Sequence, residues 1–492
     1  MYVSASGSAA PDVRLVGLAL SGNSATGEAS GLGNGGAVLV RGSRLAVLCG
    51  FLSGNRARAD GGACWLSLGG LVVASSSFSN CSAGGSGGAL LVEDSPSNLT
   101  VTLSSFAANV AANGGGISLR SCSGAVLLSG VVLDGNAALQ GSGGGASVLY
   151  ASGALRLELC RLSNNRAWMD GSALYLSTVL EAAQDPKFIP SWVQLGYVET
   201  ELPSGNDVPY AIRNCTVASN SAANGNGAIA LSGMARMVLD ATSFTKNQAR
   251  SGGAFFCRQN SSANLSSVLF QSNSADYGGA VHAQDSCLIG LAGSELVSNS
   301  AGVCGGALSL NSTNPVTASG LVHITLNSAD RSGGGVCVLV RETAQSPLCH
   351  SRAGVHPVMF SLRPNALVRI ELNSAKGQGG AIYFSCVTPG SAALQVWSSQ
   401  NLTLSPPSSS RRGLPGIDRP SRLEELEPAS RSADPHGTDD EILNALSDCL
   451  LPLLRSLTSN HTASAAERSI RGDGRSILGK VLFAVHCRFS CT

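Results

Sequence analysis

The stretch SFTKNQARSGGAFF (residues 243–256) is followed one period later by LFQSNSADYGGAVH (residues 269–282), and this repetition indicates the fold class. Each copy holds an aromatic residue three positions before an Asn, then a Gly-Gly-Ala turn, then a short apolar segment. Similar copies recur through most of the chain, usually 25 to 29 residues apart. A repeat of that length is typical of a solenoid in which each coil packs only on its neighbours.

The segments between the glycines are short and rich in β-forming residues, for example residues 37–40, 45–48 and 155–159. A helical repeat would need two amphipathic runs of ten or more residues, and none fits between these turns. We therefore predict an all-β chain, a right-handed parallel β-helix of about 12–13 coils. Equivalent residues of neighbouring coils then stack about 4.8 Å apart.

Stacked coils predict a ladder of Asn side chains at one corner, because a carboxamide can bond to the coils above and below and tolerates left-handed backbone. The Gly-Gly pair supplies the next corner, and the apolar residue before each Asn is expected to point inward. We expect the ladder to contain Asn23, Asn55, Asn80, Asn109, Asn136, Asn165, Asn220, Asn247, Asn273, Asn299, Asn327 and Asn373.

The paired Phe-x-x-Asn and Gly-Gly-Ala signatures resemble the repeats of the chlamydial polymorphic outer-membrane protein family across residues 13–386. The resemblance implies a pectin-lyase-like right-handed β-helix that serves as a surface-exposed adhesin. Family passengers are followed by a membrane β-barrel, and the residues after 386 lack its series of alternating ten-residue strands. Residues 1–11 also lack the basic start of a secretion signal, which suggests a fragment or a mis-started chain.

The composition divides the chain into four parts. Residues 1–12 are an N-terminal remnant, and residues 13–386 are the repeat domain, with loop insertions at 181–210 and 341–366. Residues 387–440 are a linker rich in Pro and Ser, for which we expect disorder. Residues 441–492 are an irregular tail whose leucines predict a short helix over 441–457.

The 15 cysteines favour an extracellular protein, although β-helices also bury free thiols. Cys160 and Cys215 each lie five residues before a repeat Asn, so they should stack on neighbouring coils at a Cα separation that suits a disulfide. The alternative is a pair of stacked free thiols. Eight Asn-x-Ser/Thr sequons allow glycosylation in such a compartment.

The two insertions fall at the same point of the coil, so both loops should emerge on one side of the solenoid. The first carries Trp192 and Tyr197, which we single out as stacking contacts for a glycan or a peptide. The alternative is that both insertions are tolerated surface loops.

The net charge of +1 and the scattered arginines disfavour nucleic-acid binding, and no apolar run is long enough for a transmembrane helix. We expect a monomeric, non-catalytic protein of the extracellular space or cell surface that acts in adhesion or display and binds a glycan or protein ligand. No catalytic residue, cofactor site or metal site is predicted.

The alternatives are a carbohydrate-active β-helix enzyme, either a lyase or a hydrolase, and a structural wall or matrix spacer. The enzyme hypothesis depends on four acidic residues that recur near the Gly-Gly corner, which are Asp60, Asp170, Asp276 and Asp330. Asp is also a common turn residue, which explains the recurrence equally well.

Overall fold

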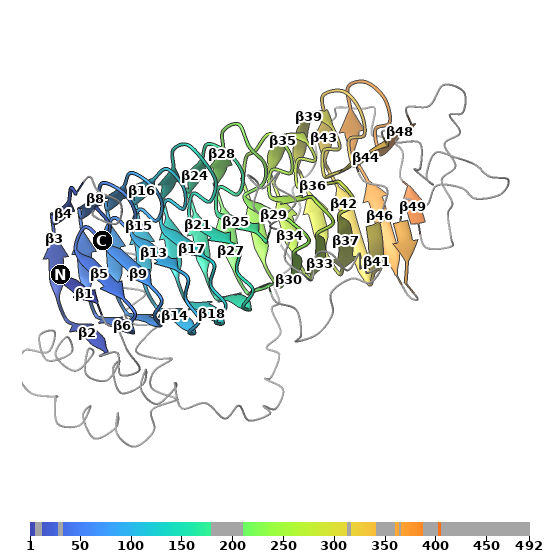
Figure 1. Ribbon diagram of the computed structural model, residues 1–492. Coiled ribbons are helices and arrows are strands. Elements are labelled where there is room, and N and C mark those ends of the chain that lie inside the picture. The colour runs from blue at the N-terminus through green and yellow to red at the C-terminus, as the bar shows by residue number, and fades with distance from the viewer. Residues whose placement is uncertain are drawn as a thin grey trace, which may run out of the picture. The chain divides into compact units, whose positions relative to one another are not determined.

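The computed structural model describes residues 1–4, 12–27, 33–178, 210–311, 316–340, 360–363, 366–386 and 402–404. These residues form a parallel β-solenoid, as predicted, and none of them lies in a helix (Figure 1). Contacts divide the chain into residues 1–421 and residues 422–492, and the second unit lies outside the described residues. Almost every coil contributes one strand to each of three long sheets, and in most coils a shorter strand pairs just after the Asn corner.

Sheet A has 13 parallel strands. In spatial order they are β1 (Tyr2–Ser4), β5 (Val38–Arg41), β9 (Cys64–Ser67), β13 (Leu90–Glu93), β17 (Ile117–Arg120), β21 (Ala146–Leu149), β25 (Leu174–Ser177), β29 (Ile229–Ser232), β32 (Phe255–Cys257), β36 (Val281–Gln284), β40 (Leu308–Asn311), β44 (Val336–Val340) and β48 (Ile382–Cys386).

Sheet B has 12 parallel strands. They are β2 (Val13–Val16), β6 (Leu45–Leu48), β10 (Leu71–Ala74), β14 (Leu99–Thr102), β18 (Val126–Ser129), β22 (Leu155–Glu158), β26 (Tyr210–Arg213), β30 (Arg236–Asp240), β33 (Ser262–Ser266), β37 (Leu288–Ala292), β41 (Val316–Ser319) and β45 (Phe360–Leu362).

Sheet C again has 13 strands. They are β3 (Ala19–Ser21), β7 (Phe51–Ser53), β11 (Ser77–Ser79), β15 (Ser105–Ala107), β19 (Val132–Asp134), β23 (Arg161–Ser163), β27 (Thr216–Ala218), β31 (Ser243–Thr245), β34 (Leu269–Gln271), β38 (Glu295–Val297), β42 (Leu321–Thr325), β46 (Leu367–Glu371) and β49 (Leu402–Leu404).

Sheet D consists of the short strands just after the Asn corner, in blocks of seven and four. Gln248 bridges the two blocks by pairing with Ser221 and Ser274. The strands are β4 (Ser24–Ala25), β8 (Arg56–Ala57), β12 (Ser82–Ala83), β16 (Val110–Ala111), β20 (Ala137–Ala138), β24 (Arg166–Ala167) and β28 (Ser221–Ala222), then β35 (Ser274–Tyr277), β39 (Ser300–Cys304), β43 (Ser328–Ala329) and β47 (Ser374–Ala375).

Sheet C shows how the repeat builds the core, because the middle residue of each three-residue strand points inward. Phe78 stacks on Phe106 with ring centroids 4.7 Å apart, and Phe244 stacks on Phe270 at 4.9 Å. All four rings are fully buried. The predicted inward position of the apolar residue before the Asn is therefore confirmed.

The Gly-Gly corner needs glycine for two different reasons. Gly252 has a φ of +58°, a left-handed conformation that side chains disfavour. Gly253 has no such φ, but a Cβ on it would collide with the carbonyl oxygens of Gly279 and Ser274 on the next coil. The first glycine turns the chain, and the second lets two coils approach closely.

Two strands lie outside the predicted repeat domain. β1 pairs with β5, so the N-terminal remnant begins sheet A. β49 pairs with β46, so the expectation of disorder throughout residues 387–440 is wrong at these three residues, where backbone pairing adds a strand to sheet C. The predicted helix over 441–457 lies outside the described residues. So do both insertions, except for Tyr210 at the end of the first and residues 360–363 and Ala366 in the second. Within the described part of the chain, no helix could cross a membrane.

Candidate ligand-binding surface

The Asn corner is held by a ladder of carboxamides, of which Asn247 is a representative rung. Its Nδ2 donates to Oδ1 of Asn273 at 2.9 Å and to the carbonyl oxygen of Val217 at 2.9 Å, and its backbone N–H donates to the same Oδ1 at 3.0 Å. Its own Oδ1 accepts from both nitrogens of Asn220. Each rung therefore joins three coils and satisfies every polar atom of a buried side chain.

The same side-chain contact between consecutive asparagines recurs from coil to coil. The Nδ2 to Oδ1 distance is 2.9 or 3.0 Å at each rung, and the bonds join Asn23 to Asn55, Asn109 to Asn136, Asn136 to Asn165, Asn165 to Asn220, Asn220 to Asn247, Asn247 to Asn273, Asn273 to Asn299, Asn299 to Asn327, and Asn327 to Asn373.

The predicted rung at Asn80 is wrong. Phe78 pairs with Phe106, so the residue aligned with Asn109 is Cys81, and Asn80 is an exposed residue with a φ of +54° one position earlier. The backbone N–H of Cys81 still donates to Oδ1 of Asn109 at 2.9 Å. A buried thiol thus replaces the carboxamide. Because Asn80 is adjacent to this thiol in the sequence, it was mistaken for the rung.

A second ladder, which the sequence analysis did not identify, lies at the corner between sheets B and C. Here the backbone N–H of one coil donates to a side-chain oxygen or sulfur of the next. Gly50 donates to Oγ of Ser76 at 2.9 Å, Ser76 donates to Oγ of Ser104 at 3.0 Å, and Val268 donates to Oγ of Ser294 at 3.1 Å. The recurring small polar residue five positions before the Asn was the available signal.

Cys160 and Cys215 belong to this second ladder, and both are free, buried thiols. The prediction of a disulfide between them is wrong, although they do stack in the same register. The backbone N–H of Cys160 donates to Sγ of Cys215 at 3.3 Å, while the two thiols lie 3.3 and 3.6 Å from the carbonyl oxygens of Leu128 and Leu157 on their preceding coils. Each sulfur therefore serves as a ladder group, as the serines do.

Disulfides form instead between cysteines at different positions of the repeat. Cys257 ends β32 and is bonded to Cys287, which directly precedes β37 on the next coil, with a Cα separation of 5.9 Å. Cys304 ends β39 and is bonded to Cys337 of β44 at 5.7 Å. The two cysteines of each pair occupy different positions of the repeat, so the repeat register did not predict these disulfides.

The outer face of sheet A is covered by the Gly-Gly segments, which buries a column of outward residues. His282 belongs to this column, with only 5 % of its surface exposed, and its ring stacks on Phe256 at 5.8 Å. Nδ1 of His282 has no hydrogen-bond partner among the described residues. Burial lowers the pKa of His282 from its ordinary value of 6.5 to about 4, so the ring is neutral at pH 7.

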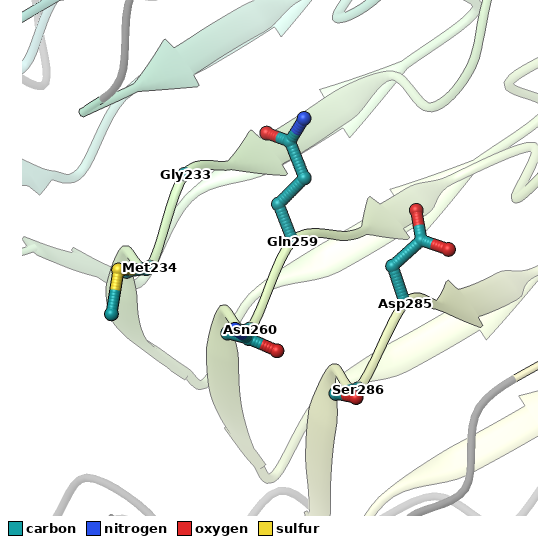
Figure 2. Close-up of a pocket in the computed structure, with 6 residues that line it drawn as sticks. All are labelled: Gly233, Met234, Gln259, Asn260, Asp285 and Ser286. Carbon is teal, nitrogen blue, oxygen red and sulfur yellow. The ribbon is translucent and has the colours of Figure 1, made fainter. Parts of the chain in front are cut away.

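A shallow hollow of about 370 Å³ opens at the corner between sheets A and B (Figure 2). Three consecutive coils each contribute two residues with positive φ, and the side chains of Gln259 and Asp285 project from it side by side. The Cys257 to Cys287 disulfide joins two of these turns. The lining residues are Gly233, Met234, Gln259, Asn260, Asp285 and Ser286.

Three of the recurring aspartates stabilise the Gly-Gly corner. Oδ1 of Asp60 accepts from the backbone N–H of Ser86, and Oδ1 of Asp170 accepts from both nitrogens of Asn226 at 2.9 Å. Asp330 forms an exposed ion pair with Lys376 at 2.7 Å. No group of three potential metal ligands occurs in the described ranges.

The predicted stacking contacts, Trp192 and Tyr197, lie outside the described residues. The described surface does carry one strongly exposed Trp, Trp168 on sheet D, which the sequence analysis did not single out. No protein-family model, curated protein or solved structure matches this chain, so the geometry of its faces is the basis for a functional conclusion.

Proposed function

We propose that this chain is a non-catalytic β-helix protein of the extracellular space or cell surface that acts in adhesion or surface display. The observation that carries the proposal is the contrast between the two faces of sheet C. Inside, the register is uniformly apolar, whereas the first outward position changes in almost every coil. Along the solenoid these outward residues are Ser77, Ser105, Val132, Arg161, Thr216, Ser243, Leu269 and Glu295.

A scaffold with constant ladders and variable outer residues is suited to present side chains at fixed spacing. The buried Asn rungs keep the coils in register, so an outward substitution changes the surface without disturbing the core. Rigid presentation lowers the entropy lost when a ligand binds. Because the function lies in these surface residues, the fold alone names no ligand.

The disulfides Cys257 to Cys287 and Cys304 to Cys337 support the proposed compartment. Disulfides persist in secreted and surface proteins and are rare in reducing cytosol. The positions of the repeat signatures also support the likeness to polymorphic outer-membrane protein repeats. In most units the Asn forms the ladder and the Gly-Gly pair forms the close contact between coils.

The carbohydrate-active enzyme is the weaker alternative. Asp60 and Asp170 are bound to backbone or side-chain donors that fix a turn, and Asp330 is paired with Lys376. Asp276 then lacks an acidic partner of the recurring set that could serve as the second catalytic carboxylate. Glycoside hydrolysis commonly needs two such groups.

Export of the native protein tests the proposal. Surface-exposed, secreted and intracellular fractions are digested without reduction and searched for peptides of this chain. We expect them in the first two fractions, with Cys257 linked to Cys287. The full chain immobilised on beads should then retain intact glycans or surface proteins. Recovery from the intracellular fraction alone, with reduced cysteines, would refute an extracellular role.

A further inference from the structure

The outer face of sheet D carries an exposed apolar group centred on Trp168. This residue directly follows β24 and has 53 % of its surface exposed. Its neighbours Leu139 and Met169 are exposed to 62 % and 45 %. A Trp in solvent on a flat β face, with its indole uncovered, is a typical anchor for a ligand.

The residues beside Trp168 leave space for a flat ligand. Ala167 pairs with Ala222, and the backbone N–H of Ala223 donates to the carbonyl oxygen of Ala167 at 3.0 Å, so Ala223 is aligned with Trp168 one coil further on. Ser221 is likewise aligned with Arg166. The coil after Trp168 therefore presents only small side chains at these positions, and its backbone lies about 4.8 Å from the backbone of Trp168.

Two guanidinium groups border this space. Arg166 lies two residues before Trp168 on the same face of the strand. Two coils on from Trp168, the backbone N–H of Arg250 donates to the carbonyl oxygen of Gly225 at 2.8 Å, which places Arg250 beside Gly225, two residues beyond Ala223. Both are exposed, and neither forms an ion pair within the described part of the chain. Asp170, the acidic residue nearest in sequence, is buried and bound to Asn226.

We propose that this face, termed the Trp168 platform and defined by Arg166, Trp168, Ser221, Ala223 and Arg250, binds an acidic glycan. The inference rests on the proposed function and names its ligand class. The apolar face of a sugar ring would stack on the indole. A carboxylate or sulfate would accept a bidentate hydrogen bond from Arg166 or Arg250, a geometry that guanidinium groups favour.

Other occupants fit the platform less well. Exposed apolar surface is limited to three side chains, whereas a stable protein partner usually buries about 800 Å² on each side. The two exposed guanidinium groups, neither of which forms an ion pair among the described residues, favour an anion over a neutral sugar. The first exposed carboxylate further along this face is Asp276, which is aligned with Arg250 on the next coil, because its backbone N–H donates to the carbonyl oxygen of Arg250 at 2.9 Å. Asp276 therefore ends the basic stretch around Trp168.

Titration calorimetry of the full chain with hexasaccharides of heparin and hyaluronan, and with neutral maltohexaose, tests the platform. We expect an acidic hexasaccharide to bind, with affinity falling as salt rises, and maltohexaose to bind at least ten-fold more weakly. Trp168→Ala and Arg166→Gln should each weaken the acidic ligand about ten-fold. Since both side chains are exposed, the urea midpoint should not change.

Matched controls are Arg156→Gln, an exposed Arg of the same coil on sheet B, and Phe51→Ala, an exposed aromatic residue on sheet C with 60 % of its surface accessible. Both should bind as the unmodified protein does. The platform would be overturned if neither acidic hexasaccharide bound the protein. It would also be overturned if Trp168→Ala bound an acidic hexasaccharide as tightly as the unmodified protein does. Tighter, Trp168-dependent binding of a poly-glutamate peptide would overturn the choice of a glycan.

The test of the Trp168 platform and the test of the proposed function can fail independently. A chain found only inside cells would refute the extracellular role while leaving the Trp168 dependence measurable on the purified protein. A surface-located chain that adheres to cells equally well with and without Trp168 would leave the proposed role in place and remove the platform.

Discussion

Asn55 and Cys81 occupy successive positions of one ladder, and the Asn55 carboxamide nitrogen lies 3.9 Å from the Cys81 sulfur. At the regular rungs that nitrogen meets a carboxamide oxygen at 2.9 to 3.0 Å. The sulfur of Cys81 lies instead 3.5 Å from the carbonyl oxygen of Leu52. The ladder is therefore continuous through backbone donors at this coil but lacks one strong side-chain bond.

Replacing Cys81 with Asn should complete the ladder. The new carboxamide would accept from Asn55 and donate to Asn109 and Leu52, so we expect a gain of about 1 kcal/mol in stability from the net value of buried hydrogen bonds. The measurement is the urea midpoint. The matched control is Asn80→Gly, which changes the exposed left-handed neighbour and should shift the midpoint little. A lower midpoint for Cys81→Asn would show that the site has no room for the carboxamide.

Removing an interior rung should have the opposite effect. Asn247→Ala leaves buried donors on Asn220 and buried acceptors on Asn273 and Val217 without partners, so we expect a loss of about 3 kcal/mol or more. Lys246→Asn is the control, because this neighbour is exposed, has a φ of +56°, and is replaced by Asn in other coils. Equal midpoints for the two variants would contradict a stabilising role for the ladder.

His282 should make the protein sensitive to acid. Its folded pKa of about 4 lies below the ordinary value of 6.5, so the unfolded chain binds more protons between these values. The neutral ring thus contributes stability that is complete above pH 6.5 and is lost as the pH falls towards 4, by about 3 kcal/mol.

His282→Phe, which matches Phe256 in the aligned position of the preceding coil, should reduce this pH dependence. The test compares urea midpoints of both proteins between pH 7.5 and 4.5. Parallel losses in the two proteins would show that other groups cause the acid sensitivity.

The buried thiols and the disulfides should differ in reactivity. Burial raises the pKa of Cys122 to about 11, so this thiol should resist alkylation at pH 8 until the protein unfolds. Cys160 and Cys215 should also resist alkylation in the folded protein, because burial keeps the reagent away from both sulfurs. Peptide mapping before and after denaturation should find these three as protected thiols. A peptide that links Cys160 to Cys215 would contradict their assignment to the second ladder.

Removing a disulfide should destabilise the coils that it joins. The Cys304 to Cys337 bond closes a loop with a sequence separation of 33, for which chain entropy predicts a loss of about 4 kcal/mol on removal. The double variant Cys304→Ser with Cys337→Ser should therefore unfold at lower urea. Cys122→Ser, a single buried thiol, is the control for introducing a hydroxyl. A midpoint equal to that of the control would contradict a stabilising crosslink.

Much of the solenoid could be predicted because its repeat is local. Phe244 with Asn247 and Gly252 with Gly253 recur with the same short spacing, and parallel stacking converts recurrence into contact. The predictions failed where two candidate rung residues are adjacent in the sequence, and where the bonded cysteines occupy different positions of the repeat. Asn80 and Cys81 differ by one position, and only strand pairing decides which faces inward.

The binding surface was less predictable for the same physical reason. Trp168 is a single aromatic residue within an ordinary repeat, and its importance depends on the small residues of the next coil, 55 positions later in the chain at the Ala167 to Ala222 pair. The insertion interrupts that spacing, so the sequence does not display the two segments as neighbours.

The parallel β-solenoid, the inward aromatic stack and all but one of the Asn rungs could be predicted from the amino-acid pattern, because each depends on residues repeated within one coil. Contacts between coils were needed to show that Cys81 is a rung, that Cys257 pairs with Cys287, that His282 is buried on the outer face of sheet A, and that Trp168 lies beside small residues. These properties depend on which residues of different coils meet in space, and that is set by register and by the path of the chain around its corners.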